Sequence, residues 1–372
     1  MPRPAQNAPG SAWHPVVVTR VLFVVLDGQP TRHLSPEITP HLWALAGEAG
    51  QRPGRATGVM PAATYPNHAT FVTGRPPVDH GILANWFFVD GRATTAESVG
   101  VDGHTLFDAC LDAGRSSALV VGDQHLVGVV AGDRADSHWP PDGRVPHGSA
   151  RDAKGYIADE DLVPRVAEAI AAGYDFVFAQ VNGPDTVGHV FGPDAPEAID
   201  GYRATDALVA GLRETMAESW SDTVAIVVSD HTMETLTHPA PLDAFTLASE
   251  RGMLGLPDGG SALFQGDHEP AWLGEVEGCA GWEPVAPDTW SAWTEPGWWF
   301  AIAGLEAEYR GMHGNPTTLE QVALVSGGHP AARALAEQVA AGSVSALDWG
   351  PTVAGLLELS LPDAVGRDLL AS

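Results

Sequence analysis

The residues of this chain that could do chemistry are carboxylates and histidines placed just after short apolar runs. They are Asp27 after the run 21–26, Asp185 and His189 after the run 174–181, Asp230 and His231 after the run 223–229, and His313 in a Gly-Met-His-Gly sequence. Burying so many ionisable groups together would be very costly unless cations compensate their charge. Carboxylate and imidazole ligands without thiolate suit Zn²⁺ and, less well, Mn²⁺.

Each of these signals has an ordinary structural alternative. Asp27 precedes a glycine, and an Asp-Gly pair after a strand is usually a turn. Asp185 and His189 could be a surface pair, and the Asp230-His231 pair could cap a following helix or loop. The joint pattern favours a shared site, because each of three strand-like runs delivers such groups just past its last apolar residue.

Thr64 offers a nucleophile. The residues at 60–68 read Met-Pro-Ala-Ala-Thr-Tyr-Pro-Asn-His and lead into a helix-like run at 69–73, which Gly74 closes. Thr64 is predicted at the cap of this helix, where free N–H groups and the helix dipole favour an anion such as a phosphoryl oxygen. A bound metal would also favour its alkoxide. The alternative is purely structural, since threonine is a common N-cap.

Strands and helices in alternation must bring these positions together. The strand-like runs are 21–26, 118–121, 176–179 and 224–228, and the helix-like stretches are 41–46, 162–172, 200–219 and 353–359. Thr39 would cap the first of these helices, with Pro40 in its first position. The alternation predicts an α/β fold with a mostly parallel central sheet flanked by helices on both faces. In such sheets the chemistry lies at the carboxyl ends of the strands.

The chain is predicted to form one catalytic domain with an insertion. We expect residues 1–15 to be a flexible N-terminal segment and residues 16–372 to be the domain. Between residues 232 and 312 the sequence becomes rich in Gly, Pro and Trp, and six of the 12 tryptophans lie there. We interpret this region as a cap over the strand ends, with most of its tryptophans forming its own core.

Composition excludes several classes of partner. A formal net charge of -28 repels phosphate backbones and anionic lipid surfaces, so neither a nucleic acid polymer nor a membrane is expected as a partner. Lys154 is the only lysine, which argues against any mechanism that needs a lysine clamp. Two cysteines provide no disulfide framework, and no secretion signal or membrane span is visible. A cytoplasmic protein is the plain expectation, and its oligomeric state is open.

Taken together, these motifs resemble the nucleotide pyrophosphatase/phosphodiesterase family of the alkaline phosphatase superfamily. The matching sequences are Leu26-Asp27-Gly28, Thr64-Tyr65-Pro66-Asn67-His68, Thr73-Gly74, His80-Gly81-Ile82 with Asn85, Pro184-Asp185 with Gly188-His189, Ser229-Asp230-His231 and His313-Gly314. The resemblance extends from about residue 20 to residue 370 and is weakest in the insertion. It implies an alkaline phosphatase-like fold.

The resemblance also implies a metal site and a covalent mechanism. It implies two zinc ions, one held by Asp185, His189 and His313, and one held by Asp27, Asp230 and His231 together with the Thr64 oxygen. Thr64 would attack phosphorus and form a phosphothreonine that water then hydrolyses. Asn85 would donate its amide to a nonbridging phosphoryl oxygen. His68 lies near these motifs, but we interpret it as a hydrogen-bonded structural residue.

The substrate expected from the resemblance is a small phosphoester, with nucleotides among the candidates. Family members that bind nucleotides hold the base between two aromatic residues, and Tyr65 occupies the position of the first. The second is expected shortly before Asp185, where residues 179–182 read Ala-Gln-Val-Asn, so nucleotide specificity is in doubt.

Three alternatives to a phosphodiesterase or pyrophosphatase stay open. A phosphomonoesterase ranks lower because a monoester carries an extra negative charge and the motifs contain no obvious basic group for it. A phosphonate hydrolase resembling phosphonoacetate hydrolase ranks lower because that enzyme uses lysines for the substrate carboxylate. An inactive metal-binding protein ranks last, since it would have no need of a nucleophile beside a full ligand set.

Overall fold

The computed structural model describes residues 19–238, 240–301 and 309–371. The strands of its main sheet are β1 Arg20–Leu26, β2 Gly54–Thr57, β5 Ser117–Val121, β6 Ser137–Trp139, β7 Phe176–Val181, β8 Thr223–Val228, β15 Glu320–Ser326 and β16 Val344–Ser345. They lie in the order β16-β2-β15-β8-β1-β7-β5-β6. The five strands from β8 to β6 are parallel, whereas β15 pairs antiparallel with both β8 and β2.

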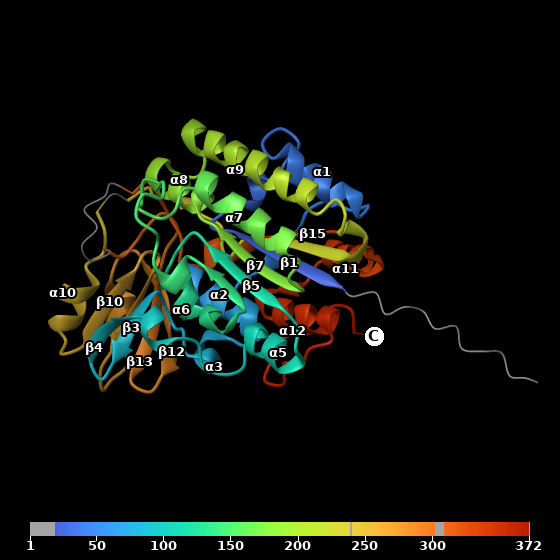
Figure 1. The fold of residues 1–372 in the computed structure, drawn as a ribbon. Coiled ribbons are helices and arrows are strands. Elements are labelled where there is room, and N and C mark those ends of the chain that lie inside the picture. Colours follow the sequence, from blue (N-terminus) through green and yellow to red (C-terminus); the bar gives the residue numbers. More distant parts are fainter. Residues whose placement is uncertain (1–18, 239, 302–308, 372) are drawn as a thin grey trace, which may run out of the picture.

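Helices cover both faces of this sheet (Figure 1). The longer helices are α1 Pro40–Glu48, α2 Thr64–Thr73, α5 Leu106–Ala113, α7 Asp159–Ala172, α8 Gly183–Phe191, α9 Pro196–Thr215, α11 Pro330–Ala341 and α12 Ala346–Leu357. The shorter ones are α3 Pro77–His80, α4 Ala96–Val99, α6 Leu126–Val129 and α10 Ala244–Ser249. The predicted α/β class with a mostly parallel central sheet is therefore confirmed. None of the helices in the described ranges is long and apolar enough to cross a bilayer.

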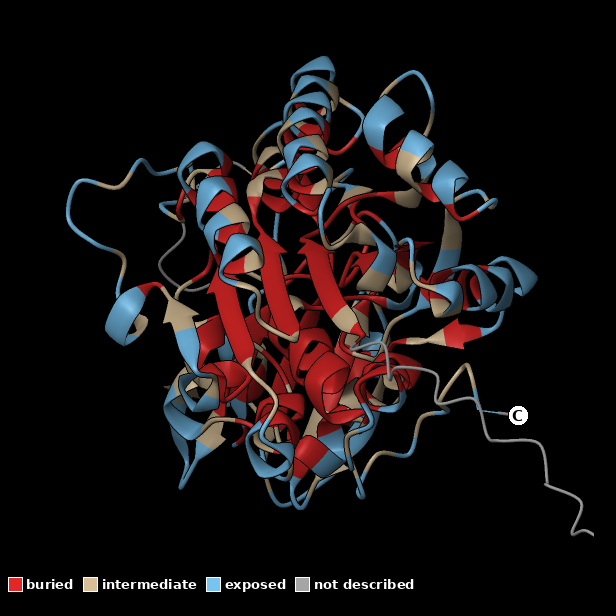
Figure 2. Cartoon of the chain, turned by 45° about the vertical axis from the view of Figure 1, so that its right-hand side comes forward, coloured by how far each residue is buried: buried red, intermediate tan, exposed pale blue. Residues whose placement is uncertain are grey.

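The central strands are buried on both sides because their side chains alternate between two cores (Figure 2). In β1, Val21, Phe23 and Val25 pack with residues of α2, α5, α11 and α12. Leu22, Val24 and Leu26 pack with residues of α1, α7 and α9 on the other face. This double burial explains why the strands are continuous β-branched and aliphatic runs rather than alternating ones.

The start of α1 differs in one respect from the sequence prediction. Pro40 occupies the first turn as expected, but the Thr39 side chain does not cap the helix. Instead the carboxylate of Asp206, in the middle of α9, accepts the backbone N–H groups of His41 at 3.1 Å and Leu42 at 2.8 Å. The cap comes from a distant helix, so local sequence does not reveal it.

The region predicted as a cap contains a second sheet with its own small core. Its strands are β10 Leu254–Asp258, β11 Ser261–Gln265, β12 Cys279–Ala286 and β13 Thr289–Thr294, in the order β10-β11-β13-β12. Phe264, Leu273 and Phe300 centre this core, and Trp272, Trp282 and Trp290 pack against it. For these three tryptophans the expected structural role is confirmed.

Two further pairs of short strands flank the site. β9 Glu234–Thr235 pairs with β14 Gly311–Met312, and β3 Trp86–Val89 forms a hairpin with β4 Arg92–Thr95. The division of the chain into one domain with a cap at 232–312 stays a prediction. The segment 1–15, expected to be flexible, lies outside the described residues.

Candidate active site

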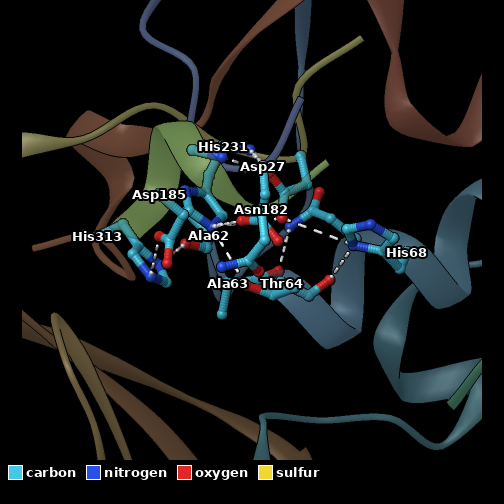
Figure 3. A network of polar contacts seen from close by, with 12 residues as sticks. Asp27, Ala62, Ala63, Thr64, His68, Asn182, Asp185, His231 and His313 are labelled. Atoms are coloured by element: carbon cyan, nitrogen blue, oxygen red, sulfur yellow. Dashed lines mark hydrogen bonds and ion pairs between the residues drawn. The ribbon is translucent and has the colours of Figure 1, made fainter. Parts of the chain in front are cut away.

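The ionisable residues singled out in the sequence lie together at the carboxyl edge of the parallel strands (Figure 3). Asp27 directly follows β1, Asp230 follows β8 after one serine, and Asp185 lies in the first turn of α8, just beyond β7. Gly28 allows their close approach. It has a φ of 63°, and a Cβ added there would lie 3.0 Å from the Asp185 Cα. Its backbone N–H donates to Asp230 Oδ1 at 3.0 Å.

One group of candidate ligands consists of Asp185, His189 and His313, all buried, with one ligand atom each within 4.8 Å of the others. Asp185 Oδ1 lies 3.2 Å from His189 Nε2 and 3.7 Å from His313 Nε2. Asp185 and His189 share a face of α8 because they are four residues apart. His313 follows β14, from the far end of the chain.

A second group consists of Asp27, Asp230 and His231, beside the Thr64 hydroxyl. His231 Nε2 lies 3.5 Å from Asp27 Oδ1 and 3.4 Å from Asp230 Oδ2. Thr64 Oγ1 is 3.4 Å from the same nitrogen. The two groups adjoin each other, because Asp27, Asp185 and His231 also offer ligand atoms within 4.8 Å of one another.

The three histidines are oriented in the same way. In each, Nδ1 contacts a backbone carbonyl, which can only accept a hydrogen bond, so Nδ1 carries the proton. The carbonyls belong to Gly311 for His189 (2.8 Å), Thr232 for His231 (3.0 Å) and Ala62 for His313 (2.9 Å). Each Nε2 therefore presents a lone pair to the carboxylates, as metal-binding histidines do.

The carboxylates show the complementary feature. Asp27 Oδ1, Asp185 Oδ1 and Asp230 Oδ2 are buried and have no hydrogen-bond partner among the described residues. Such orphaned oxygens are costly in a protein interior unless something else binds them. Three unpartnered oxygens that face three nitrogen lone pairs fit divalent cations, so the residues present match the metal group that the sequence predicts.

The electrostatics of the site reflect this crowding of like charges. Burial, together with the carboxylates of Asp230 and Asp185, raises the pKa of Asp27 well above its ordinary value. Burial alone would also raise the pKa of Asp185, but the charged and hydrogen-bonding groups around this carboxylate, the Lys154 ammonium among them, hold its pKa well below the usual range. Burial and the neighbouring histidines lower the pKa of His313, which keeps its imidazole neutral and able to bind a metal.

His68 also lies near the second group and offers an alternative ligand, since it joins Asp27 and Asp230 within 4.8 Å. Its Nδ1 is 3.6 Å from Asp230 Oδ2, but it contacts the Thr64 carbonyl oxygen at 2.8 Å. Because that oxygen only accepts, Nδ1 carries a proton and has no lone pair for a metal. His231 is therefore the better ligand, and His68 supports the first turn of α2.

Thr64 does not cap its helix. It is the first residue of α2, after Ala63 at the N-cap position, and no side-chain cap bond is formed there. The sequence placed Thr64 one position earlier, at the cap itself. With its hydroxyl free of a capping role and directed at His231 Nε2, the structural alternative for Thr64 loses its support.

Asn85 and Tyr65 lie beside the Thr64 hydroxyl and line the same pocket. The Tyr65 backbone N–H donates to Asn85 Oδ1 at 3.1 Å, so the amide oxygen of Asn85 is engaged and its NH₂ group remains a donor. The phenol of Tyr65 donates to Asp123 Oδ2 at 2.9 Å. That contact fixes the ring in a buried position at the pocket wall.

Several other residues of the pocket were not identified from the sequence. They are Asp123, Lys154, Tyr156, Asn182, Asp258, Gly259, Tyr309 and Met312. Asp123 carries the same signal as the predicted ligands, because it comes just after the strand-like run 118–121. Lys154, Tyr156 and Tyr309 follow no such pattern, and only the fold brings them to the site.

The single lysine of the chain, which nothing in the sequence placed at the site, lies in the pocket. The Lys154 ammonium is 2.8 Å from Asp185 Oδ2, and its side chain is 17% exposed. It also lies 5.5 Å from the centre of the Tyr156 ring and 5.9 Å from that of Tyr309. Two aromatic residues therefore join Tyr65 here, although the stretch 179–182 contains none.

Comparison with known proteins adds a family and a fold. A family model described as type I phosphodiesterase / nucleotide pyrophosphatase matches residues 21–263. The chain is 27% identical over 235 residues to human ectonucleotide pyrophosphatase/phosphodiesterase family member 7, covering 58% of this chain and 48% of that protein. The chain thus spans about half the length of this curated relative.

Solved structures match over a larger part of the chain. An inactive variant of murine ectonucleotide pyrophosphatase/phosphodiesterase 5 in complex with AMP superposes with a TM-score of 0.72 at 19% identity, over 94% of this chain and 97% of the other. Phosphonoacetate hydrolase from Sinorhizobium meliloti 1021, in complex with phosphonoformate, gives a TM-score of 0.65 at 17% identity, over 92% and 96%. At these identities the likeness establishes the fold.

Proposed function

Since the chain belongs to the type I phosphodiesterase / nucleotide pyrophosphatase family, we propose that it is a metal-dependent hydrolase of phosphodiester or pyrophosphate bonds. One observation carries this proposal. Three orphaned carboxylate oxygens and three imidazole lone pairs, from sites up to 286 positions apart (Asp27 to His313), converge beside the hydroxyl of Thr64. A purely structural cluster would leave those oxygens without compensation.

We propose two Zn²⁺ ions as the cofactors, with Mn²⁺ as the alternative. Asp185, His189 and His313 would hold one ion. Asp27, Asp230 and His231 would hold the other, with the Thr64 oxygen as a further ligand. A pair of such ions supplies positive charge that lowers the pKa of a hydroxyl and stabilises the attacking and leaving oxygens of an in-line displacement.

The residues of the chain divide the reaction between them. Thr64 Oγ1 attacks phosphorus, and the new oxygen–phosphorus bond forms as the bond to the leaving oxygen breaks. The hydroxyl of Thr64 loses one proton and the leaving group gains one. Water then cleaves the phosphothreonine and restores the hydroxyl. The side-chain NH₂ of Asn85 donates to a nonbridging oxygen whose negative charge grows in the transition state.

The pocket supports a small phosphoester substrate, and a nucleotide is among the candidates. Tyr65, Tyr156 and Tyr309 supply aromatic surface beside the nucleophile. Tyr156 or Tyr309 would therefore take the place of the second aromatic residue that holds a base, which the sequence at 179–182 lacks. A structural neighbour of this fold binds AMP, and its likeness supports testing nucleotides first. The cytoplasmic location stays a prediction.

Phosphonate hydrolysis is a second candidate because of Lys154. The ammonium in the pocket could face a substrate carboxylate, and a phosphonoacetate hydrolase shares the fold. Phosphodiester cleavage remains the better proposal, since Lys154 is already paired with Asp185. A phosphomonoesterase and an inactive metal-binding protein remain as the less favoured alternatives.

The deciding experiment compares bis-p-nitrophenyl phosphate, p-nitrophenyl phosphate and phosphonoacetate as substrates of the zinc-loaded protein. We expect kcat/KM to be highest for the diester, and Thr64→Ala to lose at least about a thousandfold of it. Thr64→Ser keeps the hydroxyl and serves as the matched control, retaining measurable activity. A faster monoester or phosphonate would replace the proposed substrate class, and full activity in Thr64→Ala would remove the covalent mechanism.

A further inference from the structure

Asp258 is a buried acid in the pocket wall that the proposed mechanism does not use. It is the last residue of β10, where an Asp-Gly-Gly turn leads into β11 of the second sheet. Its side chain is 7% exposed, and it lines the pocket together with Thr64 and Asn85. The turn between these two strands of the second sheet therefore reaches the pocket, through Asp258 and the adjoining Gly259.

The carboxyl group of Asp258 holds Asn85. Its Oδ2 accepts the Asn85 backbone N–H at 3.0 Å. On its other side Asn85 is held by the Tyr65 backbone N–H, which donates to its amide oxygen. Contacts from the nucleophile helix α2 and from the second sheet therefore both hold Asn85, and the Ala96 backbone N–H also donates to its backbone carbonyl oxygen at 3.2 Å.

The anchor matters because the segment that follows Asn85 pairs with no described strand of the main sheet, although its Phe87 packs into the main core. Asn85 leads directly into β3, which pairs only with β4 among the described strands. The first residue of that hairpin, Trp86, is 45% exposed. Strand β10 lies alongside β3, so the contact from Asp258 adds a constraint, besides the one from Tyr65, on where Asn85 stands relative to Thr64.

The turn that carries Asp258 is itself held firmly. The Gly260 N–H donates to the carbonyl oxygen of His313 at 2.7 Å, and the Phe300 N–H donates to the carbonyl oxygen of Gly259 at 2.7 Å. Gly259 has a φ of 72°, which suits a glycine in a tight turn. The turn thus links the backbone of His313, a candidate metal ligand, to Asn85, the candidate oxyanion donor.

A purely structural role explains Asp258 poorly. Burial raises its pKa to about 7, and only hydrogen bonds from Asn85 act to lower it. A buried carboxyl group without a cationic partner contributes little to stability by itself. The hydrogen bond with Asn85 therefore remains as the explanation for a carboxyl group at this buried position.

We propose that Asp258 is a positioning residue for phosphoryl transfer, which holds Asn85 so that its amide N–H meets the phosphoryl oxygen beside Thr64. This inference rests on the proposed role of Asn85. It also makes the second sheet a working part of the active site rather than only a cover, because the position of the oxyanion donor depends on it.

A double-mutant cycle tests this inference. On bis-p-nitrophenyl phosphate we expect Asn85→Ala to lower kcat about 100-fold, and Asp258→Ala to lower it about 10- to 100-fold with little change in KM. If Asp258 acts through Asn85, then adding Asp258→Ala to Asn85→Ala lowers kcat by less than about twofold more. Zinc content and the melting temperature are measured on every variant.

Two further variants keep the test decisive. Asp258→Asn retains the shape and one acceptor oxygen, so we expect it to recover a large part of the kcat lost in Asp258→Ala. It replaces Asp258→Ala in the cycle should the alanine variant fail to fold. Asp243→Ala is the matched control, because Asp243 also accepts a backbone N–H in this region, from Thr246 at 3.0 Å, and caps α10 away from the pocket.

The outcomes separate this inference from the proposed function. Wild-type kcat in Asp258→Ala, or losses that multiply in the double variant, would overturn the positioning role while leaving the mechanism intact. Wild-type kcat in Asn85→Ala would instead remove the proposed oxyanion donor. Loss of zinc from Asp258→Ala and Asp258→Asn alike would reassign Asp258 to support of the metal segment and would also overturn the inference.

Discussion

At the scale of single residues, the site is organised by hydrogen bonds that fix which atom each side chain presents. The three histidines point Nε2 inward because a carbonyl oxygen holds each Nδ1. Asn85 presents its NH₂ because a backbone N–H occupies its oxygen. Such contacts decide the chemistry as much as the identity of the residues, since a rotated ring or amide would present the wrong atom.

Tyr65→Phe tests the contact that fixes the pocket aromatic. It removes the phenol that donates to Asp123 at 2.9 Å, so the buried carboxyl group loses a donor. We expect the free energy of unfolding to fall by about 1–3 kcal/mol and kcat/KM to fall by a larger factor than in a matched control. Tyr202→Phe is that control, because its buried hydroxyl donates to the Pro193 carbonyl oxygen and Tyr202 does not line the pocket. Equal kcat/KM in the two variants would contradict a role for the ring position.

The sequence could place single residues relative to the sheet where the signal was local. Asp27, Asp185 and Asp230 stand at strand ends, and a parallel sheet must bring such positions to one edge. Asp258 gives no comparable signal, because an Asp-Gly-Gly sequence reads as an ordinary turn. Its contact with Asn85 spans 173 positions and depends on how two sheets meet.

At the scale of elements, some helices depend on charges supplied by other helices. Asp206 of α9 accepts two N–H groups at the start of α1, at 3.1 and 2.8 Å. We expect Asp206→Ala to lower the free energy of unfolding by about 1–2 kcal/mol, measured by urea denaturation. Asp200→Ala on the same helix is the control. It removes only an exposed ion pair with Arg203 and should change stability by less than about 0.5 kcal/mol. Similar losses in both variants would argue against capping from a distance.

The first turn of α7 is expected to make stability depend on pH. Burial raises the pKa of Asp159 to about 6 from an unfolded value of 3.8, although Thr205 and the Gly183 N–H donate to it. The folded state therefore binds the proton more tightly. The stabilisation is complete below pH 3.8 and is lost as the pH rises through about 6.

Asp159→Asn removes this dependence and allows the measurement. Between pH 5 and pH 8, the free energy of unfolding of the wild type should fall by about 1–2 kcal/mol relative to that of the variant. Urea denaturation of both proteins across this range checks the prediction. A constant difference between them would show that Asp159 does not titrate in this interval.

The positions of the strands in the sequence could be predicted better than the directions in which they run in the sheet. The expected strands at 21–26, 118–121, 176–179 and 224–228 correspond to β1, β5, β7 and β8, because buried strands are apolar throughout. Strand β15 was not predicted, and its antiparallel direction has no signature in composition. The cap of α1 was assigned to Thr39 because local sequence does not reveal a distant carboxylate.

At the scale of the whole molecule, the fold brings carboxylates together and leaves their charge to be compensated. Removing bound metal with a chelator should lower the melting temperature by roughly 5–10 °C, because ions that bind only the folded state stabilise it. Differential scanning calorimetry measures the shift. A variant with His189→Ala and His313→Ala should show a smaller shift, since it lacks two ligands of one group. The same shift in that variant would place the stabilising ion elsewhere.

The position of Lys154 has a practical consequence for labelling. This chain of 372 residues contains a single lysine, and that lysine lies in the pocket beside Asp185. Apart from the α-amino group, reagents that acylate amines therefore have one target, and it adjoins the candidate nucleophile. Mass spectrometry of the peptide that contains it would report how fully the pocket is filled, because an occupying molecule would shield the amine from acylation.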